Sequence, residues 1–249
     1  MTALLGYNTN GFAHHRLDDA LAIIAEIGYQ SVGLTPDVHH EVTSSIDLHG
    51  LTPVIETGAR FILDPRRKHQ PTLMGDQREV RIDFYRRCID VAGEIGATCV
   101  SLWSGVGDDR AALVDGLGQV LDHAGDAIAI GFEPEPGMHI ETLAQYEELK
   151  RELPALKLTI DVGHVHCLCE MRPEEALRKY ADDLVNVHLD DHRRDVHEHL
   201  MFGEGEIDWP PVMQALGELD VPATVELSRH SANAVVAAQQ AWDYLSRLR

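Results

Sequence analysis

Short apolar runs alternate with amphipathic stretches along the whole chain of 249 residues. Eight of these runs have the length and composition of buried strands. They cover residues 4–7, 31–34, 52–56, 98–102, 128–133, 157–161, 184–189 and 222–227. Regular alternation of strand and helix is typical of a parallel sheet, because parallel neighbours need a long crossover connection between them.

Helical periodicity is clear between residues 17 and 27, where five apolar residues share one face and Gly28 follows as a stop signal. Further helices are expected over 81–95, 111–124, 142–153, 173–180, 210–219 and 232–248. The residues expected to begin helices are three N-caps and two first-turn prolines, namely Asp109, Glu141, Ser231, Pro173 and Pro210.

Eight strands, each followed by a helix or a helical loop, predict an α/β fold of the (β/α)₈ TIM-barrel type, with residues 1–249 forming one domain. A doubly wound sheet would need a glycine-rich phosphate-binding turn after an early strand. The segment Gly203-Glu204-Gly205 is only a GxG sequence and follows a loop, so it gives no dinucleotide-binding signal.

The net charge of −20 argues against nucleic acid as a partner, because a chain this acidic repels a polyanion. No apolar run approaches the ~20 residues needed to span a bilayer, and the N-terminal segment has no signal-peptide pattern. The four cysteines form no CxxC pair and are expected to be reduced, which favours a cytoplasmic location. The oligomeric state is left open, and a homo-oligomer is one arrangement the chain allows.

In four consecutive strands, a short apolar run is followed directly by an ionisable side chain: Glu133, Asp161, His188 and Glu226. The carboxyl ends of barrel strands form one face, so these groups are expected to meet there. Three clustered carboxylates repel one another, and a cation removes that penalty. Carboxylate and imidazole ligands without thiolate predict a divalent ion: Mn²⁺, Mg²⁺, Co²⁺ or Zn²⁺. Glu135, two residues after Glu133, is an alternative ligand.

Five segments together resemble the xylose-isomerase-like TIM-barrel superfamily, which contains sugar-phosphate isomerases and epimerases, ketohexose 3-epimerases, inosose dehydratases and endonuclease IV. The resemblance covers almost the whole chain. Its carriers are Phe132-Glu133-Pro134-Glu135-Pro136-Gly137, Ile160-Asp161-Val162-Gly163-His164, Val187-His188-Leu189-Asp190-Asp191, Gly203-Glu204-Gly205-Glu206-Ile207-Asp208 and Val225-Glu226-Leu227.

The resemblance implies a metal-dependent sugar or polyol isomerase or epimerase, with or without a phosphate on its carbohydrate-like substrate. The four ionisable residues at the strand ends match the metal ligands of the ketohexose epimerases. Glu133 and Glu226 match the acid/base pair, which moves a proton at a carbon next to a carbonyl. His164 and Arg194 match residues that contact substrate.

Endonuclease IV is the competing template. It carries further metal-binding histidines, two of which correspond to His164 and His199. It also needs histidines at the ends of strands three and four, where this chain has Ile55-Glu56-Thr57 and Leu102-Trp103-Ser104. A second metal site formed by His164, His197 and His199 would favour a multi-zinc hydrolase or lyase acting on a small phosphate ester. A barrel that only binds its ligand is the third hypothesis.

Two further features suggest substrate contacts. The segment 58–77 carries a basic cluster that includes Arg60 and Lys68, and such a cluster could bind a phosphate or carboxylate. A solvated loop explains the same composition. Trp103 follows the fourth strand run, where an aromatic wall could stack on a sugar ring, although ordinary packing at the rim is the alternative.

Overall fold

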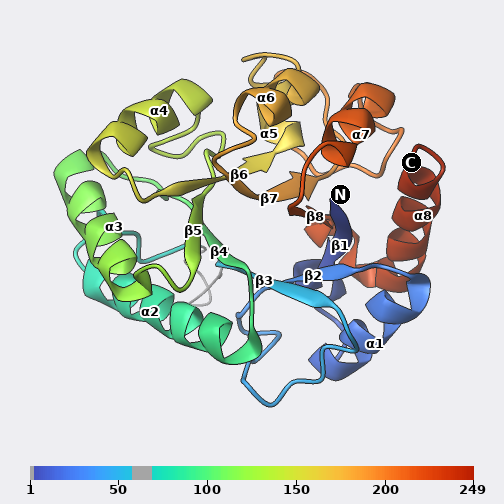
Figure 1. Cartoon of the computed structure of the whole chain (residues 1–249), viewed down its shortest axis with the longest axis horizontal. Helices are drawn as coiled ribbons and strands as arrows, with labels where there is room; N and C mark the ends of the chain where they lie inside the picture. Colours follow the sequence, from blue (N-terminus) through green and yellow to red (C-terminus); the bar gives the residue numbers. More distant parts are fainter. Residues whose placement is uncertain (1–2, 58–68) are drawn as a thin grey trace.

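The computed structural model describes residues 3–57 and 69–249, whose strands close into one parallel barrel (Figure 1). Neighbouring strands follow the chain order from β1 to β8, and β8 pairs with β1. The strands are β1 (Leu4–Asn8), β2 (Ser31–Leu34), β3 (Thr52–Glu56), β4 (Cys99–Leu102), β5 (Ala129–Phe132), β6 (Lys157–Asp161), β7 (Leu184–Leu189) and β8 (Pro222–Val225). The predicted (β/α)₈ barrel is confirmed, and all eight strand runs are found within two residues of their expected ends.

Helices surround the barrel on its outside (Figure 1). The α-helices are α1 (Leu17–Ile27), α2 (Arg78–Ile95), α3 (Arg110–Ala124), α4 (Leu143–Glu152), α5 (Val162–Cys167), α6 (Pro173–Lys179), α7 (Trp209–Gly217) and α8 (Ala234–Ser246). Two 3₁₀ helices, η1 (Thr9–Phe12) and η2 (Ser228–Asn233), follow β1 and β8. Helix α5 was not expected, because six residues are too few to show a helical period.

Two of the expected N-caps are wrong. Thr142, not Glu141, begins α4: its side chain accepts a hydrogen bond from the backbone N–H of Gln145 at 3.2 Å, and the Gln145 side chain accepts one from the N–H of Thr142 at 3.0 Å. This reciprocal capping box satisfies two backbone donors at once. Ser231 lies within η2, and Asn233 directly precedes α8. Asp109 is confirmed as the cap of α3.

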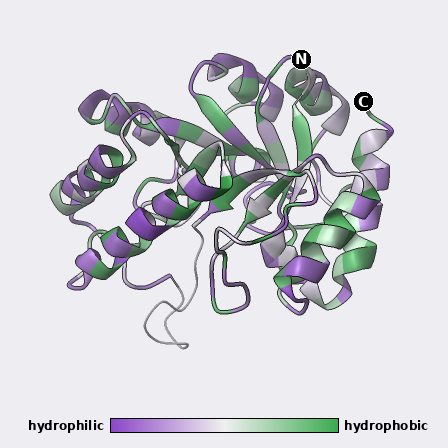
Figure 2. Cartoon of the chain, turned by 60° about the horizontal axis from the view of Figure 1, so that its bottom comes forward, coloured by the Kyte–Doolittle hydropathy of each residue, from purple (hydrophilic) through white to green (hydrophobic). Residues whose placement is uncertain are grey.

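Strands in the centre of the molecule are mainly hydrophobic, and the helices carry hydrophilic residues on their outer faces (Figure 2). The apolar side chains of the two layers form one buried cluster. Inside the barrel, however, a polar layer lies near the carboxyl ends of the strands. The Ser101 hydroxyl lies 2.9 Å from that of Thr159, and the Asn186 amide donates to Ser101 at 3.3 Å. Because β4 is adjacent to neither β6 nor β7, these contacts cross the interior.

All four cysteines are free, as expected, and three of them are buried. Among the described residues, no helix combines the length and the apolar character needed to cross a membrane.

Close approach of β1 and β2 requires glycine at position 6. A Cβ there would lie 2.8 Å from the backbone oxygen of Ser31 and 2.2 Å from its hydroxyl. We expect Gly6→Ala to lower the free energy of unfolding by about 1–3 kcal/mol through overpacking. A Cβ at Gly93, on the exposed face of α2, would project into open space, so Gly93→Ala should instead stabilise the protein by about 0.5–1 kcal/mol. Urea unfolding of both variants and the wild type measures these changes in the free energy of unfolding. Equal changes in the two variants would contradict the requirement for glycine at position 6.

Candidate metal centre and its pocket

The barrel brings the four predicted ligands together at one end. Glu133 directly follows β5, Asp161 ends β6, His188 is the fifth residue of β7, and Glu226 directly follows β8. Each contributes one nitrogen or oxygen atom to a group in which all atoms lie within 4.8 Å of one another. Glu135 also lines the pocket but is not in this group, so the geometry favours Glu133 as the ligand.

Asp161 is oriented by the helix that it caps. Its Oδ1 accepts hydrogen bonds from the backbone N–H groups of Gly163 at 2.7 Å and His164 at 3.1 Å. Its Oδ2 is buried and has no hydrogen-bond partner, and His164 Nε2 lies 3.6 Å from it. A buried carboxylate oxygen normally has a partner, so this atom is well suited to bind a cation. The short α5 helix therefore fixes which oxygen faces the centre.

His188 contacts carboxylates on both sides of its ring. Its Nδ1 lies 3.2 Å from Glu133 Oε1 and 3.3 Å from Glu226 Oε2, and its Nε2 lies 2.9 Å from Glu56 Oε1. Asn10 Nδ2 in turn donates to Glu226 Oε1 at 2.8 Å. The second oxygen of Glu226 is thereby directed towards His188 and the centre of the group.

Burial dominates the electrostatics of this group. Desolvation raises the pKa of Glu133 to about 7, against the opposing effect of His188 and with further increases from Glu226 and Asp161. The pKa of Asp161 is also raised to about 7, first by burial and then by the charge of Asp190. Burial by itself would lower the pKa of His188, but Glu56 and Glu133 raise it well above its usual value.

The donor set suits a divalent cation. Three carboxylates and one imidazole are oxygen and nitrogen ligands of the kind that Mn²⁺, Mg²⁺, Co²⁺ and Zn²⁺ accept. Asp161 Oδ2, which accepts no hydrogen bond, and the crowding of three carboxylates and His188 within 4.8 Å fit the same conclusion. Without a cation, the buried carboxylates reduce their negative charge by binding protons. The raised pKa values of Glu133 and Asp161 express this tendency.

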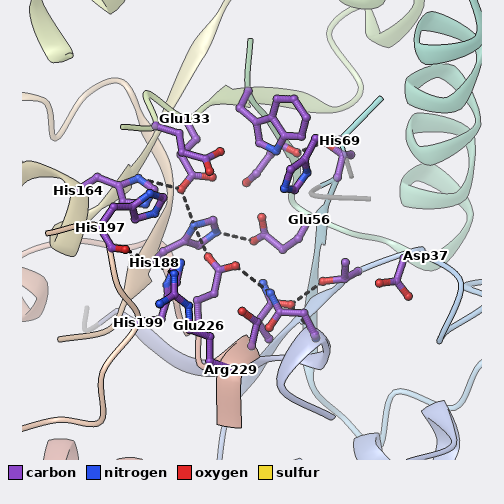
Figure 3. Close-up of a pocket in the computed structure, with 18 residues that line it drawn as sticks. Asp37, Glu56, His69, Glu133, His164, His188, His197, His199, Glu226 and Arg229 are labelled. Atoms are coloured by element: carbon purple, nitrogen blue, oxygen red, sulfur yellow. Dashed lines mark hydrogen bonds and ion pairs between the residues drawn. The ribbon is translucent and has the colours of Figure 1, made fainter. Parts of the chain in front are cut away.

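The centre lies in a cavity of about 250 Å³ (Figure 3). This volume is close to the lower end of the range of small-molecule pockets. Its described lining is mainly polar and acidic, and includes Asn8, Asn10, Thr35, Asp37, Glu56, Thr57, His69, Ser101, Trp103, Ser228 and Arg229 beside the residues of the centre. Among the described lining residues, Arg229 is the only arginine or lysine.

A cluster of four histidine rings lies beside the centre, and three of them, His164, His197 and His199, line the pocket. The rings of His164, His192, His197 and His199 have centroids 4.9–6.3 Å apart in every pair. One nitrogen each of His164, His197 and His199 also forms a group within 4.8 Å, as the second predicted metal site requires. His164 Nδ1 lies 3.2 Å from the carbonyl oxygen of Pro134, an arrangement in which Nδ1 donates and Nε2 is left unprotonated. The Nε2 atoms of His164 and His197 are buried without a hydrogen-bond partner.

Asp190 contacts two rings of this histidine cluster, and the neighbouring Asp191 contacts the loop that carries it. Asp190 is fully buried, with His192 Nε2 3.1 Å from its Oδ1 and His199 Nδ1 in close contact with its Oδ2. Burial by itself would lower the pKa of both rings, but contact with Asp190 raises the pKa of His192 to about 11 and that of His199 to about 9. Asp191 accepts from the backbone N–H of Gly203 at 2.8 Å and thus ties the loop between β7 and α7 together.

Of the predicted substrate-binding residues outside the histidine cluster, one lines the pocket, one lies away from it and two lie outside the described residues. Trp103 lines the pocket, and only 4% of its surface is exposed. Arg194 is exposed and is not among the described lining residues, and its backbone N–H donates to Glu206 at 3.2 Å. Arg60 and Lys68 lie outside the described residues. Arg229 lines the pocket instead, and its Nη2 donates to the carbonyl oxygen of His197 at 3.4 Å.

Sequence reasoning missed the roles of Glu56, Asn10 and Arg229. Glu56 ends an apolar strand run in the same way as the four ligands, so the signal that found them could have found it. Asn10 and Arg229 lie in 3₁₀ helices after β1 and β8, and no local pattern marks them.

Comparisons with known proteins agree with the fold. The family description "Xylose isomerase-like TIM barrel" matches residues 49–248, and the chain therefore belongs to this family. The solved structure of 3-keto-D-glucoside 4-epimerase YcjR from E. coli is similar at a TM-score of 0.76 and 16% identity, over 98% of this chain and 99% of that chain. The structure described as "IOLI protein with a binding zinc atom" is similar at a TM-score of 0.74 and 17% identity. The similarity covers 100% of this chain and 98% of that chain.

A curated relative is the uncharacterized protein MJ1614 of Methanocaldococcus jannaschii, with 24% identity over 163 residues. The match covers 62% of this chain and 64% of the relative, which is less than two thirds of its length. The fold of this chain is one that sugar epimerases share.

If the four strand-end residues bind a metal ion, stripping the protein with a chelator and adding Zn²⁺ or Mn²⁺ should raise its unfolding temperature. A metal at 100 times its Kd stabilises the folded state by about 2.7 kcal/mol. Asp161→Asn should abolish this increase, because it removes the charge of one carboxylate of the ligand group. Asp37→Asn removes the same charge from the pocket lining, outside the ligand group. This variant should keep the metal-induced increase in unfolding temperature. An equal increase in all three proteins would contradict the site.

Proposed function

We propose that this protein is a metal-dependent sugar or polyol isomerase or epimerase that moves a proton at a carbon next to a carbonyl group. The observation that carries the proposal is the convergence of Glu133, Asp161, His188 and Glu226 at the carboxyl end of the barrel. The family membership and the epimerases that share the fold support the same reaction class.

Glu133 and Glu226 are the proposed acid/base pair. They follow strands β5 and β8, which are separated by two strands on one side of the barrel, so their carboxylates approach the pocket from different directions. One of them removes the proton from a substrate carbon, and the other delivers a proton to the opposite face. Burial, which raises the pKa of Glu133 to about 7, makes that carboxylate a stronger base than an exposed glutamate.

The proposed metal ion would be held by the three carboxylates and His188. When bound, a divalent ion polarises a carbonyl oxygen and makes the adjacent C–H bond more acidic. The rest of the pocket positions substrate through hydroxyl and amide side chains such as Asn8, Thr35 and Ser228, which suit the hydroxyl groups of a small carbohydrate. Trp103 supplies an apolar surface in this polar cavity.

We expect Glu133→Gln and Glu226→Gln each to reduce proton exchange by roughly 10²–10⁴-fold, because each removes one acid/base group. The measurement is deuterium incorporation from ²H₂O into a panel of free and phosphorylated ketoses, followed by NMR, with the metal content of each variant determined in parallel. Glu218→Gln alters an exposed surface ion pair with Arg178 and should leave exchange unchanged. Full activity in either pocket variant with metal bound would refute the assignment.

The histidine cluster favours a second candidate function, a multi-zinc hydrolase or lyase acting on a small phosphate ester. Its support is the group of nitrogen atoms from His164, His197 and His199 within 4.8 Å. Elemental analysis of the zinc-loaded protein separates the two functions. One ion per chain, unchanged by His197→Ala, agrees with the isomerase. Two ions per chain, reduced to one by the same substitution, agree with the hydrolase or lyase.

A further inference from the structure

His188 can bind a metal ion only through a ring nitrogen that carries no hydrogen. A neutral imidazole has one N–H and one bare nitrogen, and the partner of the N–H decides which nitrogen is bare. In this protein Nδ1 faces Glu133 and Glu226 in the proposed centre, whereas Nε2 faces Glu56 at 2.9 Å. Figure 3 shows the ring between these two sets of carboxylates.

We infer that Glu56 is a positioning residue that fixes the tautomer of His188. Its carboxylate accepts the hydrogen of Nε2, which leaves Nδ1 bare and directed at the proposed metal centre. A carboxylate in this position also makes the imidazole a stronger ligand. This inference rests on the metal centre proposed above and adds to it a residue that is not itself in the ligand group.

The position of Glu56 is specified by the barrel. Glu56 ends β3, which is not a neighbour of β7, so its contact with His188 crosses the barrel interior. It is only 5% exposed. Gly33 on the adjacent strand β2 leaves room for it, because a Cβ at that position would lie 3.2 Å from Glu56 Cγ.

Asn186 holds Glu56 in place. Its Nδ2 donates to Glu56 Oε1 at 2.6 Å, and it lies two residues before His188 on β7, so both side chains project to the same interior side of the strand. Asn186 Nδ2 also lies 3.2 Å from His188 Nε2. A bare Nε2 could accept from this amide, but its lone pair would then face the Glu56 carboxylate at 2.9 Å with no hydrogen between them. The arrangement is favourable only when Nε2 carries the hydrogen.

Glu56→Gln tests the inference through metal affinity. We expect the Kd for Zn²⁺, measured by competition with a chromophoric chelator, to rise by about 10–100-fold, the usual effect of removing an outer partner of a histidine ligand. A matched variant should bind Zn²⁺ like the wild type. Asp37→Asn removes the same charge from the pocket lining, outside the ligand group.

A spectroscopic measurement gives a readout that a merely structural role would not change. In ¹⁵N-histidine-labelled wild-type protein loaded with Zn²⁺, the His188 resonances should report a coordinated Nδ1 and a protonated Nε2. This measurement needs no variant and still decides the question if Glu56→Gln fails to fold. Coordination through Nε2, or a Glu56→Gln variant that binds Zn²⁺ as tightly as the wild type, overturns the role of Glu56. A wild-type protein that binds no divalent metal overturns the proposed function instead.

Discussion

Burial of several carboxylates at one end of a closed barrel is the constraint on which the rest of this structure depends. Removing a charged group from water is costly unless a partner compensates, and Glu133 and Asp161 are both nearly inaccessible. Their pKa values of about 7 express that cost. A domain selected for stability alone would place apolar side chains at these positions, and the arrangement therefore indicates a function that requires the clustered charge.

The contacts around the centre restrict the orientation of its buried ionisable side chains. Asp161 is fixed by the backbone N–H groups of α5, Glu226 by Asn10, and His188 by the carboxylate of Glu56. Each partner leaves one ligand atom directed at the common space. Orientation of this kind allows an ion to bind without reorganisation of the side chains, because each one is already held by a second interaction.

The histidine cluster is also held by interactions with carboxylates, mainly on the loop that follows β7. Asp190 follows β7 directly and contacts two imidazoles, while Asp191 ties the following loop to the barrel. One face of the barrel therefore carries two groups of potential ligands, one on strand ends and one mainly on a loop. Loops at this face differ more readily than strands, which is why members of one barrel family can carry out different reactions.

The amino-acid sequence by itself determined the architecture of the barrel and the four residues of the candidate centre. Strand length, helical periodicity and the ionisable residues at strand ends are local properties, and local patterns are enough to place Glu133, Asp161, His188 and Glu226 on one face. The start of α4 was misplaced by one residue, because Glu141 and Thr142 are adjacent and only the reciprocal bonds with Gln145 distinguish them. Only the tertiary structure decided that Arg229 and not Arg194 lines the pocket, and that Glu56 reaches His188 across the interior. Contacts between strands that are not neighbours depend on closure of the barrel. Hydrophobic periodicity along the sequence therefore does not predict them.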